Sequence, residues 1–372
     1  MGFKEIAMIY GDTDKSYRKT GKLINRIRYQ QKGGTPYRTL QENTEKEGSK
    51  LLNYVEEKTK RLLKDNGFTD DGICLESNDN YNDETQVLPE ETITKAQTKC
   101  IPGDISDEVQ SNPVCYEDPE HTVNISIDDV NVKRQEVSRN KIDDSEKGKR
   151  KYVHNTVVHI SKGERSYTLN GYGMKKVLCF VMAFIFNNDL IGNRLQFFTD
   201  GHTTLNEAIL KCFRWLKNIG IILDWYHLVK KCKEQLSMAM KGREIRNKTL
   251  EKLLPLLWQG LTDKAITLLE EIEDTQIKDK TKIKKLVEYL HRNKPYIPCY
   301  AIRKQLGLRN SSNIGEKVND LIVSYRQKHN GMSWSKEGSV ALASVTALKR
   351  NKETKKWFEE KELEFKLVAN LG

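Results

Sequence analysis

The 372-residue sequence predicts a mixed α/β fold with a helical N-terminal region and a long helical stretch in its second half. Three observations support this prediction. Between residues 121 and 227, short β-type stretches are separated first by turns and then by helical segments. Residues 15–66 and much of the chain after residue 227 show helical periodicity instead. The length exceeds that of one ordinary hydrophobic core, which predicts more than one domain.

Five strands are predicted, in the order β-β-β-α-β-α-β, with the two helices at residues 174–186 and 203–218. The first three strands have short connections, which favour an antiparallel meander. The last two strands follow helical crossovers, which favour parallel pairing. The predicted strands cover residues 122–132, 152–160, 164–169, 194–199 and 219–223. We therefore expect a mixed five-stranded sheet.

Helical segments dominate the chain after the fifth strand. Pro295 and Pro298 interrupt them, because proline cannot continue a helix interior. The polar residues 311–313 offer an N-cap for a helix through Lys328, and Ser335 offers one for a last helix through Lys349. Four helices are predicted before the prolines, at residues 228–240, 248–259, 263–272 and 283–292.

The N-terminal 120 residues divide into a basic and an acidic part. Residues 1–66 are predicted to be helical, with helices at 16–30 and 45–63 joined by a glycine-containing turn. This pair could be a DNA-binding helix-turn-helix or a plain helical hairpin, and the sequence leaves both open. Residues 67–120 are rich in Asp, Glu, Asn, Pro and Ser without apolar periodicity, which predicts an acidic linker or loosely structured connector that could be disordered.

Composition excludes several classes of protein. The longest apolar run, residues 177–186, is about half of the roughly 20 residues that a membrane-spanning helix needs. The charged N-terminus does not resemble a signal peptide, and seven cysteines without a CxxC pair favour a reducing cytoplasm over a disulfide scaffold. The net charge of +11 favours a polyanionic partner, so we expect a cytoplasmic, nucleoid-associated protein.

Two acidic positions lie on or directly after predicted strands. Asp128, with Asp129 beside it, lies on the first strand, and Asp200 closes the fourth strand. If these strands pair, the carboxylates meet at one sheet edge, where their repulsion favours a bound divalent cation such as Mg²⁺. Glu316 is the candidate third acid. Each residue also has an ordinary explanation, since the aspartates could be turn residues and Glu316 could complete a capping box with Asn313.

Four segments resemble bacterial insertion-sequence DDE transposases, closest to the Mutator-like and related families. They are residues 197–205 (FFTDGHTTL), 221–232 (IILDWYHLVKKC), 309–320 (RNSSNIGEKVND) and 331–339 (GMSWSKEGS). The resemblance covers roughly residues 121–360 and implies a ribonuclease-H-like catalytic core. The first part of this core would be residues 121–227, residues 228–309 would be an all-α insertion, and residues 310–372 would form the final helices that carry the glutamate.

The resemblance also implies the catalytic acids. The first Asp falls on Asp128, with Asp129 as an open alternative, and the second falls on Asp200. The Glu falls on Glu316, with Glu337 as the competing position. These acids would hold two Mg²⁺ ions, for which Mn²⁺ could substitute, and such a pair of ions catalyses phosphodiester transfer.

The family's (C/D)xxH signature falls on Asp224 and His227, which would position DNA or the scissile phosphate. The implied partners are the terminal inverted repeats of the element and target DNA, bound by a dimer or higher oligomer. Lys230, Lys231 and Lys233 follow His227 and are expected to contact the DNA backbone.

Two other functions remain open at this stage. The chain could be a catalytically silent or domesticated transposase-derived DNA-binding protein, or another ribonuclease-H-like nuclease. No P-loop motif is present in the sequence, so we expect no dependence on ATP.

Overall fold

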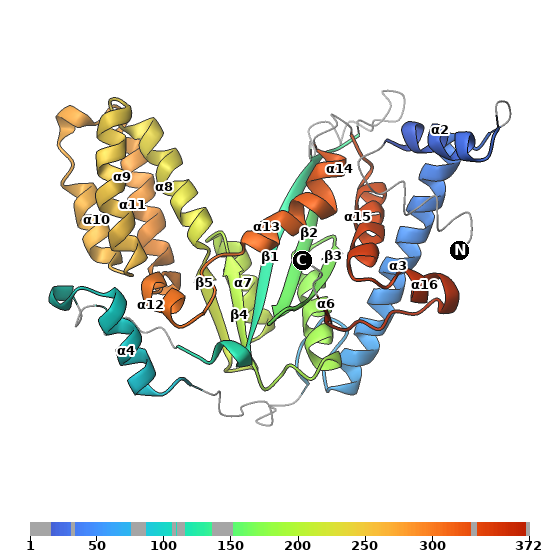
Figure 1. The fold of residues 1–372 in the computed structure, drawn as a ribbon, viewed down its shortest axis with the longest axis horizontal. Coiled ribbons are helices and arrows are strands. Elements are labelled where there is room, and N and C mark those ends of the chain that lie inside the picture. Colours follow the sequence, from blue (N-terminus) through green and yellow to red (C-terminus); the bar gives the residue numbers. More distant parts are fainter. Residues whose placement is uncertain are drawn as a thin grey trace.

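The computed structural model describes residues 16–30, 34–75, 87–105, 109, 116–135, 152–328 and 333–369; within helix α13 it leaves the side chains of residues 313, 314 and 316 undescribed. It shows a mixed six-stranded sheet in the order β5-β4-β1-β2-β3-β6, with helices on both faces (Figure 1). The predicted mixed α/β class is confirmed. The sheet has one more strand than predicted, because a short strand near the C-terminus extends it beyond β3.

The sheet has an antiparallel half and a parallel half. Strands β1, β2 and β3 form the expected meander, and β6 pairs antiparallel with β3. Strand β4 pairs parallel with β1, and β5 pairs parallel with β4. The strands are β1 (Thr122–Lys133), β2 (Tyr152–Lys162), β3 (Arg165–Gly171), β4 (Arg194–Thr199), β5 (Ile219–Leu223) and β6 (Val368–Ala369). Each predicted strand agrees with an observed one to within two residues at either end.

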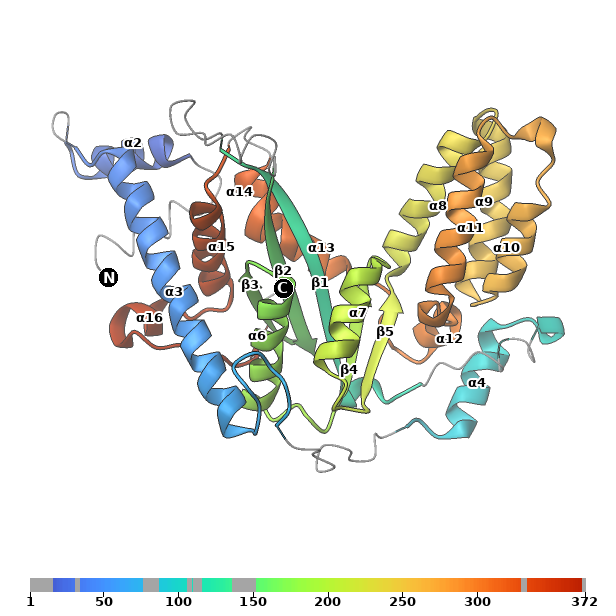
Figure 2. The ribbon, with the colours of Figure 1, turned by 180° about the vertical axis from the view of Figure 1, so that it is seen from behind.

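Alternation along β1 divides the core between the two faces of the sheet. Ile125 and Ile127 pack with helix α6 (Met174–Asn187), whereas Val130 and Val132 pack on the opposite face. Helix α6 is buried on nearly all sides because it lies between the sheet and a long N-terminal helix (Figure 2). This position explains its continuous apolar run. None of the helices in the described part of the chain is long and apolar enough to cross a membrane.

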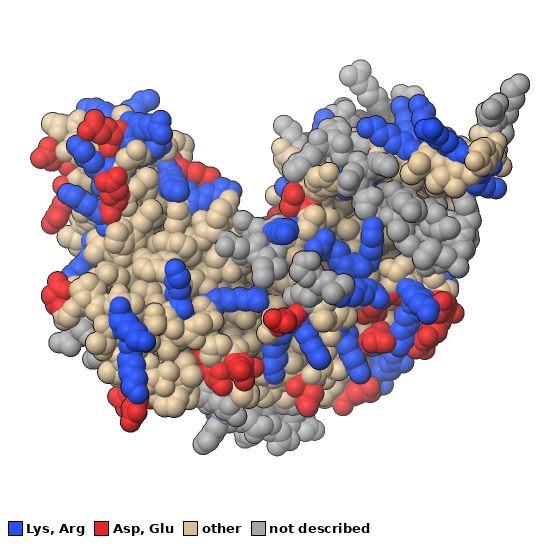
Figure 3. Space-filling view, in the orientation of Figure 1, with Lys and Arg blue, Asp and Glu red and all other residues tan. Residues whose placement is uncertain are grey.

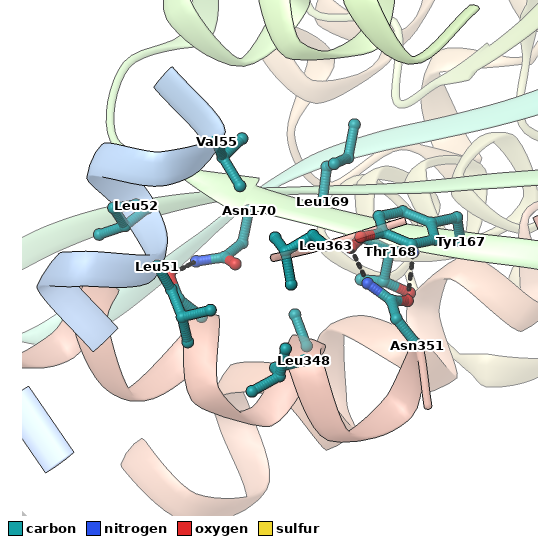
Figure 4. Close-up of a pocket in the computed structure, with 12 residues that line it drawn as sticks. Leu51, Leu52, Val55, Tyr167, Thr168, Leu169, Asn170, Leu348, Asn351 and Leu363 are labelled. Carbon is teal, nitrogen blue, oxygen red and sulfur yellow. Dashed lines mark hydrogen bonds between the residues drawn. The ribbon is translucent and has the colours of Figure 1, made fainter. Parts of the chain in front are cut away.

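The N-terminal region contains the two predicted helices, α2 (Tyr17–Ile27) and α3 (Tyr37–Asp65). Helix α3 packs on α6 and on α15 (Lys336–Arg350). At Gly48 an added Cβ atom would lie 2.2 Å from the carbonyl oxygen of Ala341, so α3 and α15 are in close backbone contact. Figure 4 shows the small cavity of about 40 Å³ between α3, β3 and α15. Helix α3 is therefore part of the core rather than a separate module.

The acidic segment contains more structure than its composition predicts. Helix α4 (Glu90–Cys100) packs on α12 (Tyr300–Gln305). Apolar residues of this segment, among them Ile101 and Tyr116, join a buried cluster with Ile302. The expectation of a loosely structured connector therefore does not hold for these described residues. The average composition hid a few apolar side chains whose partners come from a distant part of the chain.

The chain after β5 is helical, as expected, and its helices form a bundle that lies beside the β5 edge of the sheet (Figure 1). Leu228, Leu236, Leu253 and Leu290 contribute to its core, which continues into the sheet through buried residues of β4 and β5 (Phe198, Ile222 and Leu223). The four predicted helices are all present, although each begins earlier than predicted. They are α8 (Trp225–Ala239), α9 (Arg243–Trp258), α10 (Thr262–Glu270) and α11 (Lys280–Asn293).

The last helices return to the sheet. A helical run crosses the face of β1 and β2 (Figure 1). Helix α15 follows, capped as predicted by Ser335, whose hydroxyl accepts a hydrogen bond from the Gly338 N–H. The run consists of α13 (Asn313–Asn319), a π-helical turn (Asp320–Ser324) and α14 (Tyr325–Gln327). The remaining α-helices are α7 (Thr203–Cys212), which is shorter than predicted, and α16 (Thr354–Glu360). Short 3₁₀ turns are found at Gly103–Ile105, Pro119–His121, Asp274–Gln276 and Lys294–Tyr296.

Candidate functional site

Asp128 and Asp200 lie at the same edge of the sheet. In the parallel ladder of β1 and β4, Ser126 pairs with Phe198, and each aspartate comes two residues later. Strand β1 continues past this point while β4 ends at Thr199, so Asp128 stands beside the carboxyl end of β4. The structure therefore brings the first two predicted acids together.

The surroundings of Asp128 are electrostatically unusual. Burial raises the pKa of its carboxyl group, the nearby imidazole of His227 lowers it, and the negative charge of Asp200 raises it further. Its Oδ2 atom accepts a hydrogen bond of 3.0 Å from the side-chain amide of Asn319 on α13. These contacts place groups from α8, from α13 and from the turn after β4 around one carboxylate on β1.

Asp129 points away from this group. Successive side chains of a strand face opposite sides of the sheet, and Asp129 is exposed on the side opposite to Asp128. Its Oδ1 atom accepts a hydrogen bond of 2.5 Å from the hydroxyl of Thr156 on β2. Of the two neighbouring aspartates, Asp128 is the one that faces Asn319 on α13.

Asp200 lies in a turn that is held in place by contacts with helix α11. The N–H of His202 donates to Oδ1 of Asp200 over 2.9 Å, and the hydroxyl of Tyr289 on α11 donates to the Asp200 carbonyl oxygen over 3.0 Å. Gly201 has a φ of +82°, and an added Cβ atom there would lie 2.7 Å from Oδ1 of Asn293. Glycine is needed at this position for both reasons, so the turn is held against the end of α11.

Glu316 belongs to α13, and its backbone lies one helical turn before Asn319. At the neighbouring Gly315, an added Cβ atom would lie 2.7 Å from Cβ of Ser126, so α13 rests directly on β1 beside Asp128. The side chain of Glu316 is outside the described part of the structure. Glu337 lies at the start of α15 and lines a separate surface pocket with Glu56 and Lys176.

Asp224 follows β5 as Asp200 follows β4, but it is almost fully buried. It caps α8 by accepting hydrogen bonds from the N–H groups of Tyr226 (2.8 Å) and His227 (3.4 Å). It also accepts from the Ser311 hydroxyl (2.9 Å) and from both the N–H (2.5 Å) and the hydroxyl of Ser312. Asp224 thus ties the start of the insertion to the segment that leads into α13.

His227 lies on the first turn of α8, close enough to Asp128 to affect its pKa. The structure therefore separates the two residues of the predicted AspxxHis signature. Asp224 is a buried acceptor that joins two segments, and His227 faces the carboxylate edge. Within the described side chains, no group of three or more His, Cys, Asp and Glu residues is gathered closely enough to hold a metal ion. The described carboxylates at this edge are Asp128 and Asp200.

A pocket of about 540 Å³ opens beside this edge, between the start of α7 and helices α8 and α11. Figure 3 shows the molecule hollowed between the insertion and the body, with Lys and Arg side chains on both sides of the hollow. The pocket is lined by Asp200, Gly201, His202, Thr203, Thr204, His227, Lys230, Lys231, Glu234, Tyr289 and Arg292.

Sequence reasoning missed three residues that surround the acids. Asn319 lies one turn after Glu316 within the quoted segment, so helical spacing could have indicated it. Tyr289 and Asn293 belong to α11, far from the Asp200 turn in the sequence, and no local pattern points to the contact of Tyr289 with Asp200 or to the close approach of Asn293 to Gly201. Their role depends on how the insertion packs against the sheet.

Part of the chain matches a known protein family. The model of the uncharacterised protein family UPF0236 matches residues 199–363, which is less than half of the chain. The matched stretch contains Asp200, Asp224, His227 and Glu316, whereas Asp128 lies before it. No curated protein matches the chain.

Among solved structures, the chain is similar to the Drosophila P element transposase strand transfer complex. The sequence identity is 14%, and the match covers 97% of this chain and 81% of that one. The TM-score is 0.27, which is too low to show a common fold.

Proposed function

We propose that this protein is a metal-dependent DNA transposase of the DDE type with a ribonuclease-H-like core. The observation that carries the proposal is the meeting of Asp128 and Asp200 on adjacent parallel strands, beside His227 and Asn319. The order β5-β4-β1-β2-β3, with an antiparallel meander followed by two parallel strands, agrees with such a core. The net charge of +11 suits a DNA partner.

The residues at the sheet edge fit a divalent metal. Two carboxylates close enough to influence each other supply hard oxygen ligands, and a cation between them would relieve the repulsion that raises the pKa of Asp128. Asp128 and Asp200 would hold Mg²⁺, and the third ligand would come from Glu316 on α13. When bound, the metal activates a water or a 3′-hydroxyl and stabilises the leaving oxygen.

Side-chain and backbone groups of the protein would orient the two carboxylates and the scissile phosphate. Asn319 orients the Asp128 carboxylate through its 3.0 Å hydrogen bond, and the His202 N–H orients Asp200. His227 would place its imidazole beside the scissile phosphate. Such positioning and charge supply most of what phosphoryl transfer needs from a protein.

A cleavage assay on the DNA that flanks the gene tests the proposal. With Mg²⁺ we expect nicking at the element ends and joining of the freed 3′-OH to target DNA. Asp128→Asn and Asp200→Asn should each reduce the rate at least about a hundredfold, because a metal ligand is worth several kcal/mol in the transition state. Asp129→Asn is the matched control and should retain activity, since its carboxylate faces the other side of the sheet.

The same assay separates the two other functions. Binding of the ends without any cleavage would indicate a transposase-derived DNA-binding protein. Cleavage without joined products would indicate another ribonuclease-H-like nuclease. Glu316→Gln and Glu337→Gln compare the two candidate third acids, and we expect loss of activity only for Glu316→Gln. We also expect the active species to be a dimer or larger oligomer on DNA in the cytoplasm.

A further inference from the structure

The pocket beside Asp200 has a basic wall that belongs entirely to the insertion. Lys230 and Lys231 come from α8, and Arg292 comes from α11. Lys230 and Arg292 are exposed and Lys231 is half-buried, so their charged ends can reach a ligand in the pocket. Among the described lining residues the acids are Asp200 and Glu234. Since Asp200 is assigned to the metal, three cations face one remaining carboxylate.

Tyr289 builds this wall and connects it to the carboxylate edge. Its side chain is only 6% exposed, and its ring lies under both Lys231 Nζ, at 5.6 Å from the ring centroid, and the Arg292 guanidinium, at 5.9 Å. Cation–π contacts of this kind hold long cationic side chains near the ring. The hydroxyl of the same tyrosine donates to the carbonyl oxygen of Asp200. One buried side chain thus fixes two cations and the second acid relative to each other.

The start of α7, which also lines the pocket, suits an anion as well. Thr203 and Thr204 are exposed at the start of α7, and no side chain caps this helix at His202. The first N–H groups of a helix and its dipole favour negative charge. Both these N–H groups and the cations that contact Tyr289 therefore favour an anion in the pocket.

We propose that Lys231, Arg292 and Tyr289 form a phosphodiester-binding subsite of the bound DNA, directly beside the carboxylate edge. The subsite holds a backbone phosphate of the strand next to the bond that is cleaved. Tyr289 couples phosphate binding to the position of the Asp200 carboxylate, because the same side chain contacts the two cations and the Asp200 turn. The inference rests on the proposed function for the identity of the ligand as DNA, and the contacts of the subsite are sequence-independent.

The salt dependence of DNA binding tests the subsite. Binding to a duplex carrying the element end is measured in EDTA, so that no cleavage occurs. The logarithm of the binding constant falls with the logarithm of the salt concentration, and each phosphate contact contributes about 0.9 to the slope. Lys231→Gln combined with Arg292→Gln should reduce the slope by about 0.9 to 1.8. Lys252→Gln is the matched control, because Lys252 is exposed on α9 and does not line the pocket.

Tyr289→Phe tests the connection to Asp200. The ring remains under the cations, so the slope should stay at its wild-type value. The rate of metal-dependent cleavage at saturating DNA should fall about tenfold, as expected for the loss of one hydrogen bond. An unchanged melting temperature would show that the variant is folded. Full cleavage activity of folded Tyr289→Phe would overturn the positioning role of the hydroxyl.

The outcomes distinguish this inference from the proposed function. An unchanged slope in the Lys231 and Arg292 variant, or the same change with Lys252→Gln, would overturn the subsite even if Asp200→Asn abolished cleavage. A reduced slope without any cleavage by the wild-type protein would support the subsite and overturn the enzyme. If the wild-type protein does not bind the duplex at low salt, the subsite is overturned as well.

Discussion

Asp200 and Asp224 follow adjacent parallel strands and each begins a turn into a helix, but their surroundings are opposite. Asp200 is exposed and lines an open pocket, with one N–H donor to its carboxylate within the turn. Asp224 is 1% exposed and accepts hydrogen bonds from two residues of α8 and from Ser311 and Ser312. Equivalent positions in the sheet therefore serve different purposes.

The difference teaches that the same residue type after a strand can be an exposed carboxylate beside a pocket or a buried acceptor that joins two segments. A carboxylate whose lone pairs are already used by buried donors has little capacity left for a metal. Asp224 instead fixes the segment before α13, and α13 carries both Asn319 and residue 316. Asp224 is thus a positioning residue, and Asp200 is the one placed to contact ligands.

The largest expected effect is on stability at Asp224. Asp224→Ala leaves the N–H of Ser312 and the cap of α8 without their acceptor, and we expect the free energy of unfolding to fall by about 3–4 kcal/mol. Urea unfolding measures it. Asp224→Asn retains one acceptor oxygen and should recover part of the loss. Asp200→Asn is the contrasting variant and should change stability by less than about 0.5 kcal/mol; equal losses at the two aspartates would break the comparison.

The pH dependence of the free energy of unfolding tests the packing of β2 near the segment that Asp224 holds. Arg309 precedes Ser311 and Ser312 and donates a hydrogen bond to Ser161, two residues after His159 on β2. The pKa of His159 is lowered from 6.5 to about 4. Burial is the main cause, and the positive charges of Arg309 and Arg350 lower it further. Between these values the unfolded chain binds the proton and the folded chain does not. Stability is therefore complete above pH 6.5 and should fall by about 2–3 kcal/mol as the pH decreases toward 4.

Thermal or urea unfolding across this pH range measures the effect. His159→Gln should flatten this part of the profile, whereas His291→Gln, at an exposed position on α11, should leave it unchanged. A wild-type profile identical to that of His159→Gln would show that His159 does not remain neutral in the folded protein.

The smallest expected effect concerns the turn that holds Asp200. Gly201→Ala places a methyl group 2.7 Å from Asn293 Oδ1 at a φ of +82°, and we expect a loss of about 2 kcal/mol. Gly163→Ala is the matched control, because its φ is also positive but nothing lies within 4 Å of the added Cβ atom. It should cost about 1 kcal/mol, which is the backbone strain alone. Equal losses would mean that α11 does not clamp the Asp200 turn.

Part of the site could be predicted from the sequence. Asp128 and Asp200 could be expected to meet, because both the strand pattern and the lengths of the connections pointed to pairing of the first and fourth strands. The choice between Asp128 and Asp129 remained open, since the buried apolar positions of β1 change from odd numbers (Ile125, Ile127) to even numbers (Val130, Val132) across the two aspartates. The tethering role of Asp224 was also not foreseen, because its partners Ser311 and Ser312 are distant in the sequence.

Local patterns were sufficient to predict the order of strands and helices, because side-chain periodicity and turn residues act over a few positions. Helical periodicity also located the four helices that follow the fifth strand. The net positive charge follows from composition alone. The contacts of Tyr289 with Asp200, of Asn319 with Asp128, and of α3 with α15 became visible only in the folded molecule. Each joins segments far apart along the chain, and such contacts depend on how helices pack and in which register, which no local periodicity specifies.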